Sequence, residues 1–184
     1  MARILLILTL LAVTPPAWAM QFEADPVGPS ATEILAVGPI EAGDVQRLRV
    51  LVNRLPPDTT IASLHISSPG GSVAEADALA AAVRAARLVV TVDSGTSCAS
   101  ACFLIFAAAA ERRVGASAKI GVHSASIRGE DTVAAMAITT KVARRAGEYG
   151  VPPEIVGKLV LTGPRQITWL TQQDLAAMGA HPVR

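Results

Sequence analysis

Apolar and polar residues alternate along this chain with two different periods, and the change of period predicts strands followed by helices. Short runs rich in β-branched and other apolar residues predict strands at 33–37, 60–66, 88–92 and 166–170, and in a run that ends at His123. Helical periodicity or longer apolar runs predict helices at 45–53, 72–87, 101–110, 131–146 and 153–161, with a last one after Thr171. A chain that alternates strands with helices in this way is expected to form an α/β fold.

Residues at the ends of these segments support the assignments. Ser72 and Glu75 have the spacing of a capping box, so a helix is expected to begin directly after a glycine turn. Asp44 is expected to cap the first helix. The continuous apolar run at 88–92 is typical of a parallel strand that is buried on both faces. The polar residues 21–31 are expected to form an extended lead-in to the first strand.

The first 19 residues have the features of a secretory signal peptide. Arg3 supplies a positive charge, residues 4–13 are largely apolar, and Ala17-Trp18-Ala19 is an A-x-A cleavage signal. An apolar run of this length is too short to span a bilayer, which needs about 20 residues. We therefore expect a signal peptide at 1–19, export to the bacterial periplasm and one mature domain at 20–184. An uncleaved anchor is the alternative.

Composition limits the partners of the mature chain. The whole chain has 16 basic and 15 acidic residues, and removal of Arg3 with the signal peptide makes the two numbers equal. A formal net charge of zero gives no electrostatic reason to expect nucleic acid or an anionic membrane as a partner. Aromatic residues make up only 3% of the chain, so the core is expected to consist of small side chains. No internal linker or repeat indicates a second domain.

The candidate chemistry lies between residues 93 and 124. Ser100 stands at the predicted start of a buried helix, and His123 ends a short predicted strand. A serine hydroxyl is a weak nucleophile that needs a base within hydrogen-bond reach, and the free N–H groups of a helix start can hold an oxyanion. The alternative is that Ser100 is an ordinary helix cap.

A second segment supports the catalytic interpretation. The strand at 60–66 leads into Ser68-Pro69-Gly70-Gly71, where glycines let the backbone come close to a ligand. The order of strand, SPGG turn, helix, strand, Ser100 helix and His123 strand resembles the Clp protease family of serine peptidases, within the wider crotonase-like fold. The resemblance covers residues 32–180 and implies a single-domain α/β fold of repeated strand–helix units.

The same resemblance implies a role for each candidate residue. Ser100 matches the nucleophile and His123 the general base. Gly71, or its neighbour Gly70, and the N–H of Ala101 match the oxyanion hole.

The acid that completes the triad in such relatives falls on Ile167. An isoleucine can neither accept a hydrogen bond from an imidazole nor stabilise its charged form. The chain therefore works as a Ser–His dyad, recruits another acceptor such as Gln166 or a backbone carbonyl, or is inactive. Loss of a triad acid can lower turnover by about 10⁴ and still leave residual catalysis, so weak activity is expected.

The two cysteines bracket the candidate nucleophile. Cys98 and Cys102 are four residues apart, which in a helix separates their Cα atoms by roughly 6 Å, inside the range of a disulfide. They form either a disulfide in an oxidising compartment or two small buried hydrophobic groups. With two thiols and three scattered histidines, no metal site is expected.

Other polar residues are expected to have ordinary roles. His65 and His181 are interpreted as polar residues rather than ligands. Arg112 and Arg113 are expected to solvate the end of the buried helix and to favour its negative C-terminus.

These observations lead to a functional hypothesis. The chain is expected to be an exported serine peptidase that hydrolyses extended peptides or unfolded protein, bound as an added strand near the glycine turn. No cofactor is expected, and no ATP-dependent unfoldase, because an exported protein has no supply of ATP. Homo-oligomer formation stays open and could be supported by the helix after Asp131. The alternatives are an inactive Clp-like module that binds a peptide or a protein, and a crotonase-type enzyme acting on an acyl thioester.

Cleavage after Ala19 predicts a mature chain that begins at Met20. Mass spectrometry of the protein from a periplasmic fraction should find this N-terminus. A chain that keeps its first residues and fractionates with the membrane would contradict the prediction.

Overall fold

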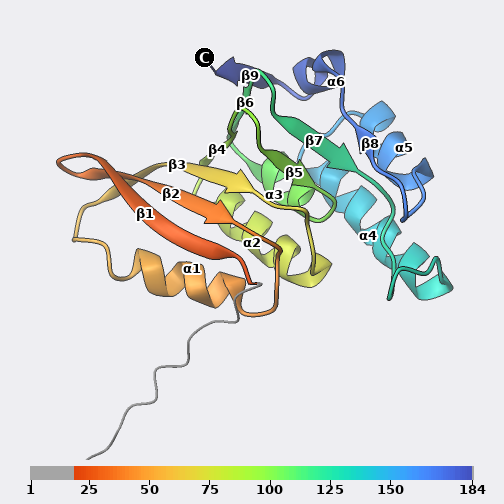
Figure 1. The fold of residues 1–184 in the computed structure, drawn as a ribbon, viewed down its shortest axis with the longest axis horizontal. Coiled ribbons are helices and arrows are strands. Elements are labelled where there is room, and N and C mark those ends of the chain that lie inside the picture. Colours follow the sequence, from red (N-terminus) through yellow and green to blue (C-terminus); the bar gives the residue numbers. More distant parts are fainter. Residues whose placement is uncertain (1–18, 184) are drawn as a thin grey trace, which may run out of the picture.

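The computed structural model describes residues 19–183, which form two β-sheets with six helices around them (Figure 1). The larger sheet has the order β1-β2-β3-β4-β6-β9, with bounds β1 (Gln21–Gly28), β2 (Ala31–Val37), β3 (Thr60–Ser67), β4 (Val89–Val92), β6 (Glu111–Gly115) and β9 (Ala180–Val183). The smaller has the order β5-β7-β8, with bounds β5 (Ser97–Ala99), β7 (Lys119–Val122) and β8 (Thr168–Trp169). The helices are α1 (Asp44–Val52), α2 (Val73–Ala85), α3 (Cys102–Ala108), α4 (Val133–Glu148), α5 (Pro153–Leu161) and α6 (Gln172–Ala177). The expected single-domain α/β fold is confirmed.

The larger sheet has one apolar face and one polar face. Its strands run parallel except β1, which lies antiparallel to β2 at one edge. Alternate residues of β2, β3 and β4 are buried in one core with α2 and α3, and these are Ile34, Ala36, Leu64, Ile66, Val90 and Val92. The intervening residues, among them Glu33 and His65, lie on the opposite, partly exposed face. Helices therefore cover the sheet on one side only.

Helix α3 lies at the centre of the core. Every residue of α3 is buried, and Phe103 and Phe106 are the largest fully buried side chains. A helix that is apolar on all sides packs against other elements all round, as α3 does between α2, α4 and both sheets. It is shorter than the expected 101–110, because the chain leaves the helix after Ala108 and enters β6 at Glu111.

The structure corrects several expectations about the strands. The segment expected to be an extended lead-in forms strand β1, and β9 after the last helix was not predicted. The charged run at Glu111, Arg112 and Arg113 begins strand β6 instead of ending a solvated helix. The strand was not predicted because its first three residues are charged and show no apolar alternation, although alternate residues do face opposite sides of the sheet. Arg113 pairs with Glu111 on one side, at 2.7 Å from Nε to Oε1, and Arg112 points the other way.

Arg112 is a half-buried cation that joins the ends of three helices. Its Nη1 donates to the carbonyl of Met178 (2.7 Å), and its Nη2 donates to the carbonyls of Tyr149 (2.9 Å) and Ala107. Met178 and Tyr149 are the C-caps of α6 and α4, and Ala107 lies in the last turn of α3. Helix C-termini carry unpaired carbonyls and a partial negative charge, so one guanidinium satisfies all three. Burial, with Arg84 nearby, lowers the pKa of Arg112 from its usual value.

The caps of the first two helices differ from the expected ones. The Ser72 hydroxyl accepts from the N–H of Glu75 (3.3 Å), but the Glu75 carboxylate accepts from the N–H of Val45 (2.7 Å). Glu75 thus caps α1 instead of its own helix. Asp44 is the first residue of α1, after an N-cap at Gly43, and its carboxylate accepts from the N–H of Glu41 (2.6 Å). Burial raises the pKa of the Asp44 carboxyl, against the opposing effects of this bond and of Arg47.

Residues 1–18 and 184 lie outside the description, and so does all of the expected signal peptide except Ala19. Of the helices within 19–183, none has the length and hydropathy needed to cross a bilayer.

Replacing Arg112 by methionine should destabilise the fold strongly. It leaves three helix-end carbonyls without their donor, and each buried unsatisfied group costs about 1–3 kcal/mol. The free energy of unfolding, measured by circular dichroism in denaturant, should therefore fall by at least about 3 kcal/mol. Arg113→Met is the matched control and should change it little, because its partner Glu111 is at the surface. Equal effects of the two substitutions would contradict the role assigned to Arg112.

Candidate active site

Ser100 lies in a sharp turn between β5 and α3. Its φ angle is +58°, a left-handed conformation that costs a non-glycine residue about 1–3 kcal/mol and persists only where the surroundings hold it. The backbone N–H of Ser100 donates to the carbonyl of Gly121 (2.9 Å), and its own carbonyl accepts from Phe103 (3.0 Å). A strained strand-to-helix turn is one way in which hydrolases expose a serine nucleophile.

The cap interpretation of Ser100 is wrong. The N-cap of α3 is Ala101, and no side chain caps this helix. Within residues 19–183 the Ser100 hydroxyl has no hydrogen-bond partner and is free to react or to bind.

The SPGG turn packs directly on Ser100. The φ angles of Gly70 and Gly71 are +99° and +142°, which favours glycine at both positions. A Cβ on Gly70 would lie 2.6 Å from the Cβ of Ser100, and one on Gly71 would lie 2.2 Å from the carbonyl oxygen of Ile40. Neither position has room for a side chain, so the two glycines are required by close approach as well as by conformation.

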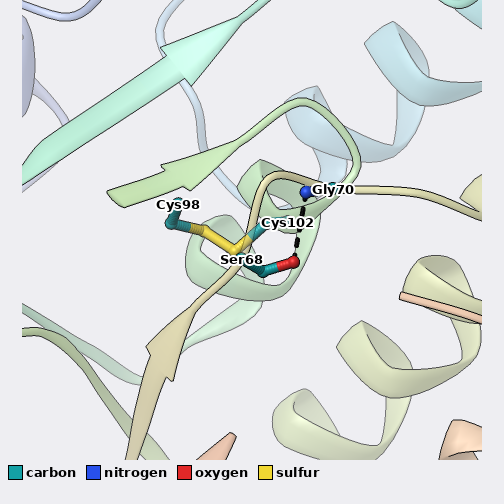
Figure 2. Close-up of a disulfide and its surroundings, with 4 residues drawn as sticks. All are labelled: Ser68, Gly70, Cys98 and Cys102. Carbon is teal, nitrogen blue, oxygen red and sulfur yellow. Dashed lines mark hydrogen bonds between the residues drawn. A yellow bond between two sulfur atoms is a disulfide. The ribbon is translucent and has the colours of Figure 1, made fainter. Parts of the chain in front are cut away.

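Two backbone N–H groups near Ser100 have no acceptor within the described residues. The N–H of Gly70 donates to the hydroxyl of Ser68 (3.1 Å; Figure 2). The N–H groups of Gly71 and Ala101 make no such bond, and the Ala101 nitrogen lies 3.0 Å from where a Cβ on Gly70 would be. Unpaired N–H groups beside a serine are the donors that an oxyanion hole needs.

A disulfide closes the base of the Ser100 turn. It joins Cys98 in β5 to Cys102 at the start of α3, with a Cα separation of 5.3 Å, and both residues are fully buried (Figure 2). Next to it, the N–H of Ser68 donates to the carbonyl of Ser97 (2.8 Å), and the Ser68 carbonyl accepts from Ala99 (3.0 Å). The nucleophile segment is thereby tied to the segment that carries the SPGG turn.

His123 follows β7 immediately and has a definite tautomer. Its Nδ1 lies 2.7 Å from the carbonyl oxygen of Ser124, which can only accept a hydrogen bond, so Nδ1 carries the proton. The neutral ring then has its free lone pair on Nε2, the form required of a base. No hydrogen bond joins His123 to Ser100 within residues 19–183. Catalytic hydrogen bonds are often long before substrate binds.

The smaller sheet brings His123 and Ser100 to adjacent segments. Strands β5 and β7 are parallel, with Ala99 beside Gly121, and the N–H of Ser100 extends this pairing. His123 is two residues beyond Gly121, on the same face of the strand.

Ile167 lies over Gly121, two residues before His123. Strands β7 and β8 are antiparallel and pair Gly121 with Trp169 and Val122 with Thr168, and Ile167 comes directly before this pairing. A Cβ on Gly121 would lie 2.7 Å from side-chain atoms of both Ile167 and Trp169, so these side chains cover the face that His123 shares. The acceptor for His123 is the Ser124 carbonyl, one of the alternatives that the sequence left open, and Gln166 makes no bond to the ring.

A groove adjoins this side of the site. It has a volume of about 780 Å³ and lies between α5 and β8, with Leu161, Gln166 and Ile167 among its lining residues. Both apolar and polar groups line it, and Ile167 belongs both to its lining and to the side chains that cover Gly121.

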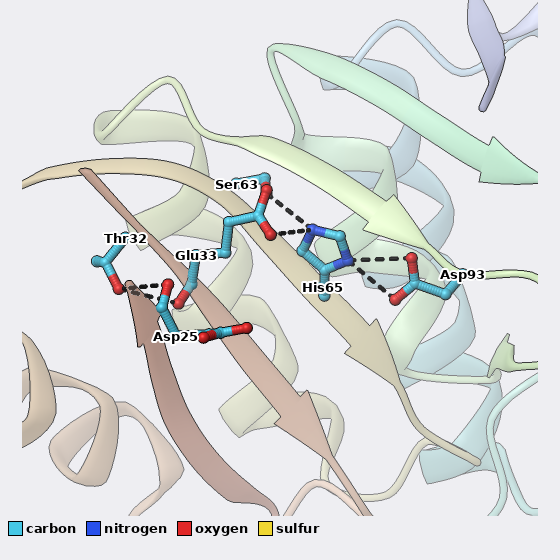
Figure 3. A network of polar contacts seen from close by, with 6 residues as sticks. All are labelled: Asp25, Thr32, Glu33, Ser63, His65 and Asp93. Atoms are coloured by element: carbon cyan, nitrogen blue, oxygen red, sulfur yellow. Dashed lines mark hydrogen bonds and ion pairs between the residues drawn. The ribbon is translucent and has the colours of Figure 1, made fainter. Parts of the chain in front are cut away.

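A second set of serine, histidine and aspartate residues lies on the polar face of the larger sheet (Figure 3). Nε2 of His65 is 2.9 Å from the Ser63 hydroxyl, Nδ1 is 2.9 Å from Asp93, and Ser63 donates to Glu33 (3.0 Å). Ser63 is only 2% exposed, in the middle of strand β3, and cannot reach a substrate. This cluster joins β2, β3 and the end of β4 as a structural network, which agrees with the ordinary role expected of His65.

Within residues 19–183 no group of three histidine, cysteine, aspartate or glutamate side chains is arranged to hold a metal ion.

Comparison with known proteins identifies the class. The family model described as Clp protease matches residues 39–148, more than half of the chain, and includes the SPGG turn, Ser100 and His123. The chain belongs to the Clp protease family, and this membership supports a peptidase-type function.

Solved structures agree on the fold. ClpP1 from Listeria monocytogenes is 21% identical, with a TM-score of 0.58, over 83% of this chain and 92% of that one, and a point mutant of the same protein gives a TM-score of 0.60 at the same identity and coverage. A mutant of 1510-N, a membrane-bound stomatin-specific protease, is 16% identical, with a TM-score of 0.60, over 84% of this chain and 77% of that one. At these identities the likeness shows the fold alone. A comparison with curated proteins gives no match.

The disulfide between Cys98 and Cys102 predicts how many free thiols the purified protein has and how its stability responds to reduction. Thiol titration of unreduced, denatured protein should find no free cysteine. Reduction should lower the free energy of unfolding by less than the roughly 3 kcal/mol expected for a 15-residue loop, because the loop between Cys98 and Cys102 is much shorter. Two free thiols would contradict the bond.

Proposed function

We propose that this protein is an exported serine peptidase that hydrolyses extended peptides or unfolded protein through Ser100 and His123. One observation carries the proposal: Ser100 is held in a strained turn against Gly70, with its hydroxyl free and an imidazole of the correct tautomer on the neighbouring segment. Backbone strain is found preferentially at functional sites, and close packing around a free hydroxyl gives the fixed position that a prepared nucleophile requires.

The chemistry follows from these groups. Nε2 of His123 takes the proton of the Ser100 hydroxyl as Oγ attacks the peptide carbonyl, and the imidazolium then returns that proton to the leaving amine. Water, activated by the same nitrogen, hydrolyses the acyl-enzyme. The developing oxyanion is held by the N–H groups of Ala101 and Gly71, because the N–H of Gly70 is already bound to Ser68.

The absence of a carboxylate is expected to slow this reaction. The Ser124 carbonyl holds His123 in the correct tautomer but offers the imidazolium only a partial negative charge. In a triad, loss of the acid costs about 10⁴ in turnover. We therefore propose a slow peptidase, with the correct geometry and weaker electrostatic support.

The substrate is proposed to bind in extended form. The SPGG turn offers backbone groups for pairing with an added strand, and the groove that Ile167 lines offers space for a side chain of the substrate. Export, action without an ATP-dependent unfoldase and self-association are further parts of the proposal. The exposure of Val133 (84%) and Met136 (59%) on α4 favours self-association.

A second function is favoured by Ile167. A Clp-like module that has lost the acid and keeps the groove would bind a peptide or a partner protein without cleaving it. The two functions differ in whether Ser100 is activated.

A fluorophosphonate probe separates these functions, because it reacts with an activated serine and leaves a structural one unmodified. Wild-type mature protein should be labelled on Ser100, Ser100→Ala should abolish labelling and peptidase activity, and His123→Ala should reduce both at least about 100-fold.

The cluster on the polar face supplies the matched controls. Ser63→Ala and His65→Ala alter a serine and a histidine of similar geometry and should leave labelling of Ser100 intact. Failure of a well-folded wild-type protein to react with the probe would establish the binding module instead.

A further inference from the structure

The peptide bond between Ser124 and Ala125 is held at both ends by side chains from different elements. Its carbonyl accepts from Nδ1 of His123 (2.7 Å). Its N–H, on Ala125, donates to the hydroxyl of Thr139 in helix α4 (2.9 Å). A trans peptide is planar and rigid, so fixing the N–H fixes the direction of the carbonyl as well.

The hydrogen bonds form a chain that runs in one direction. The Thr139 hydroxyl accepts from Ala125 and donates to the carbonyl of Ala135 (3.0 Å). The series therefore runs from the His123 ring through the peptide and the hydroxyl to the backbone of α4. Hydrogen bonds connected in this sense polarise one another, which makes the Ser124 carbonyl a better acceptor for His123.

Thr139 differs from an ordinary helical threonine. Threonine hydroxyls in helices commonly donate to the carbonyl four residues earlier, and the neighbouring Thr140 does only this, to Met136 (3.0 Å), at an exposed position. Thr139 makes the same bond but is 7% exposed and also accepts from Ala125, outside its own helix. The N–H of Ser124 donates to the backbone carbonyl of Thr162 (2.9 Å). The backbone is therefore anchored on both sides of Ser124.

We propose that Thr139 is a positioning residue for the His123 base, and that it acts by holding the Ser124 carbonyl in the role that Ile167 cannot fill. This inference rests on the proposed function of the site. Thr139 touches neither substrate nor Ser100, and its effect reaches the reaction only through the orientation and tautomer of the imidazole.

The first test measures the rate of probe labelling. Thr139→Val is nearly isosteric and removes the hydroxyl, so the labelling rate should fall about tenfold, the factor that corresponds to one hydrogen bond. Thr139→Ser keeps the hydroxyl and should restore most of the rate. Thr140→Val makes the same change on the adjacent exposed residue and should leave the rate unchanged. Thr139→Ala replaces Thr139→Val if the latter does not fold.

A double substitution separates positioning from a general structural effect. Ile167→Asp puts a carboxylate over Gly121, two residues before His123, where we expect it to offer the ring another acceptor. If Thr139 acts through the imidazole, Thr139→Val should lower the labelling rate by a much smaller factor in the Ile167→Asp protein than in the wild type. An equal loss in both proteins would overturn the proposal.

The closing experiment does not depend on activity. Nitrogen NMR of protein labelled in its histidines, at a pH where the rings are neutral, reports which nitrogen of His123 carries the proton, and His123→Ala assigns the signal. Wild type, Thr139→Ser and Thr140→Val should show the proton on Nδ1, and Thr139→Val a mixture of both tautomers. An unchanged tautomer in Thr139→Val overturns the positioning role. Absence of probe labelling with the tautomer change present overturns only the peptidase function.

Discussion

The close approach of Gly70 to Ser100 is the constraint on which the rest of the site depends. It holds the SPGG turn against the Ser100 turn, with no space for a Cβ between them. Bonds from Ser68 to the segment at 97–99 continue this contact and join the larger sheet to the smaller one. The candidate site therefore lies where the two sheets meet. A change that separated the sheets would also relax the φ angle of Ser100 and move the nearby N–H groups.

The candidate site combines a serine with a free hydroxyl and a neighbouring histidine whose ring is oriented by a backbone carbonyl. Isoleucine stands where family resemblance places the acid, and within residues 19–183 the hydrogen-bond partner of the His123 ring is the neutral Ser124 carbonyl. Orientation and charge stabilisation are separate contributions of a triad acid, and a backbone carbonyl supplies mainly the first. Ile167 also lines the groove between α5 and β8 and contributes an apolar group to its wall.

Polar side chains inside the fold mainly connect helices and strands through hydrogen bonds. Arg112 binds the C-terminal ends of α3, α4 and α6. Since α3 begins just after Ser100, this contact also supports the helix that follows the candidate nucleophile. The Ser63–His65–Asp93 network resembles a catalytic triad in its distances but lies in the middle of a strand. Burial and backbone conformation, rather than the spacing of side-chain atoms, distinguish it from the site at Ser100.

The sequence by itself determined the α/β alternation, the SPGG turn and the pairing of a serine at a helix start with a histidine after a strand, because periodicity and turn chemistry are local. Family resemblance also predicted that the position of the triad acid falls on Ile167. It did not reveal β6, because charged residues on an alternating strand lack an apolar period. It did not reveal β9 because this strand has only four residues and contains a proline. The acceptor of His123, the partner of Glu75 and the contacts of Thr139 were decided by tertiary structure alone. Each depends on which backbone groups from distant segments meet, and a backbone carbonyl or N–H is the same in every residue type and leaves no mark in the sequence.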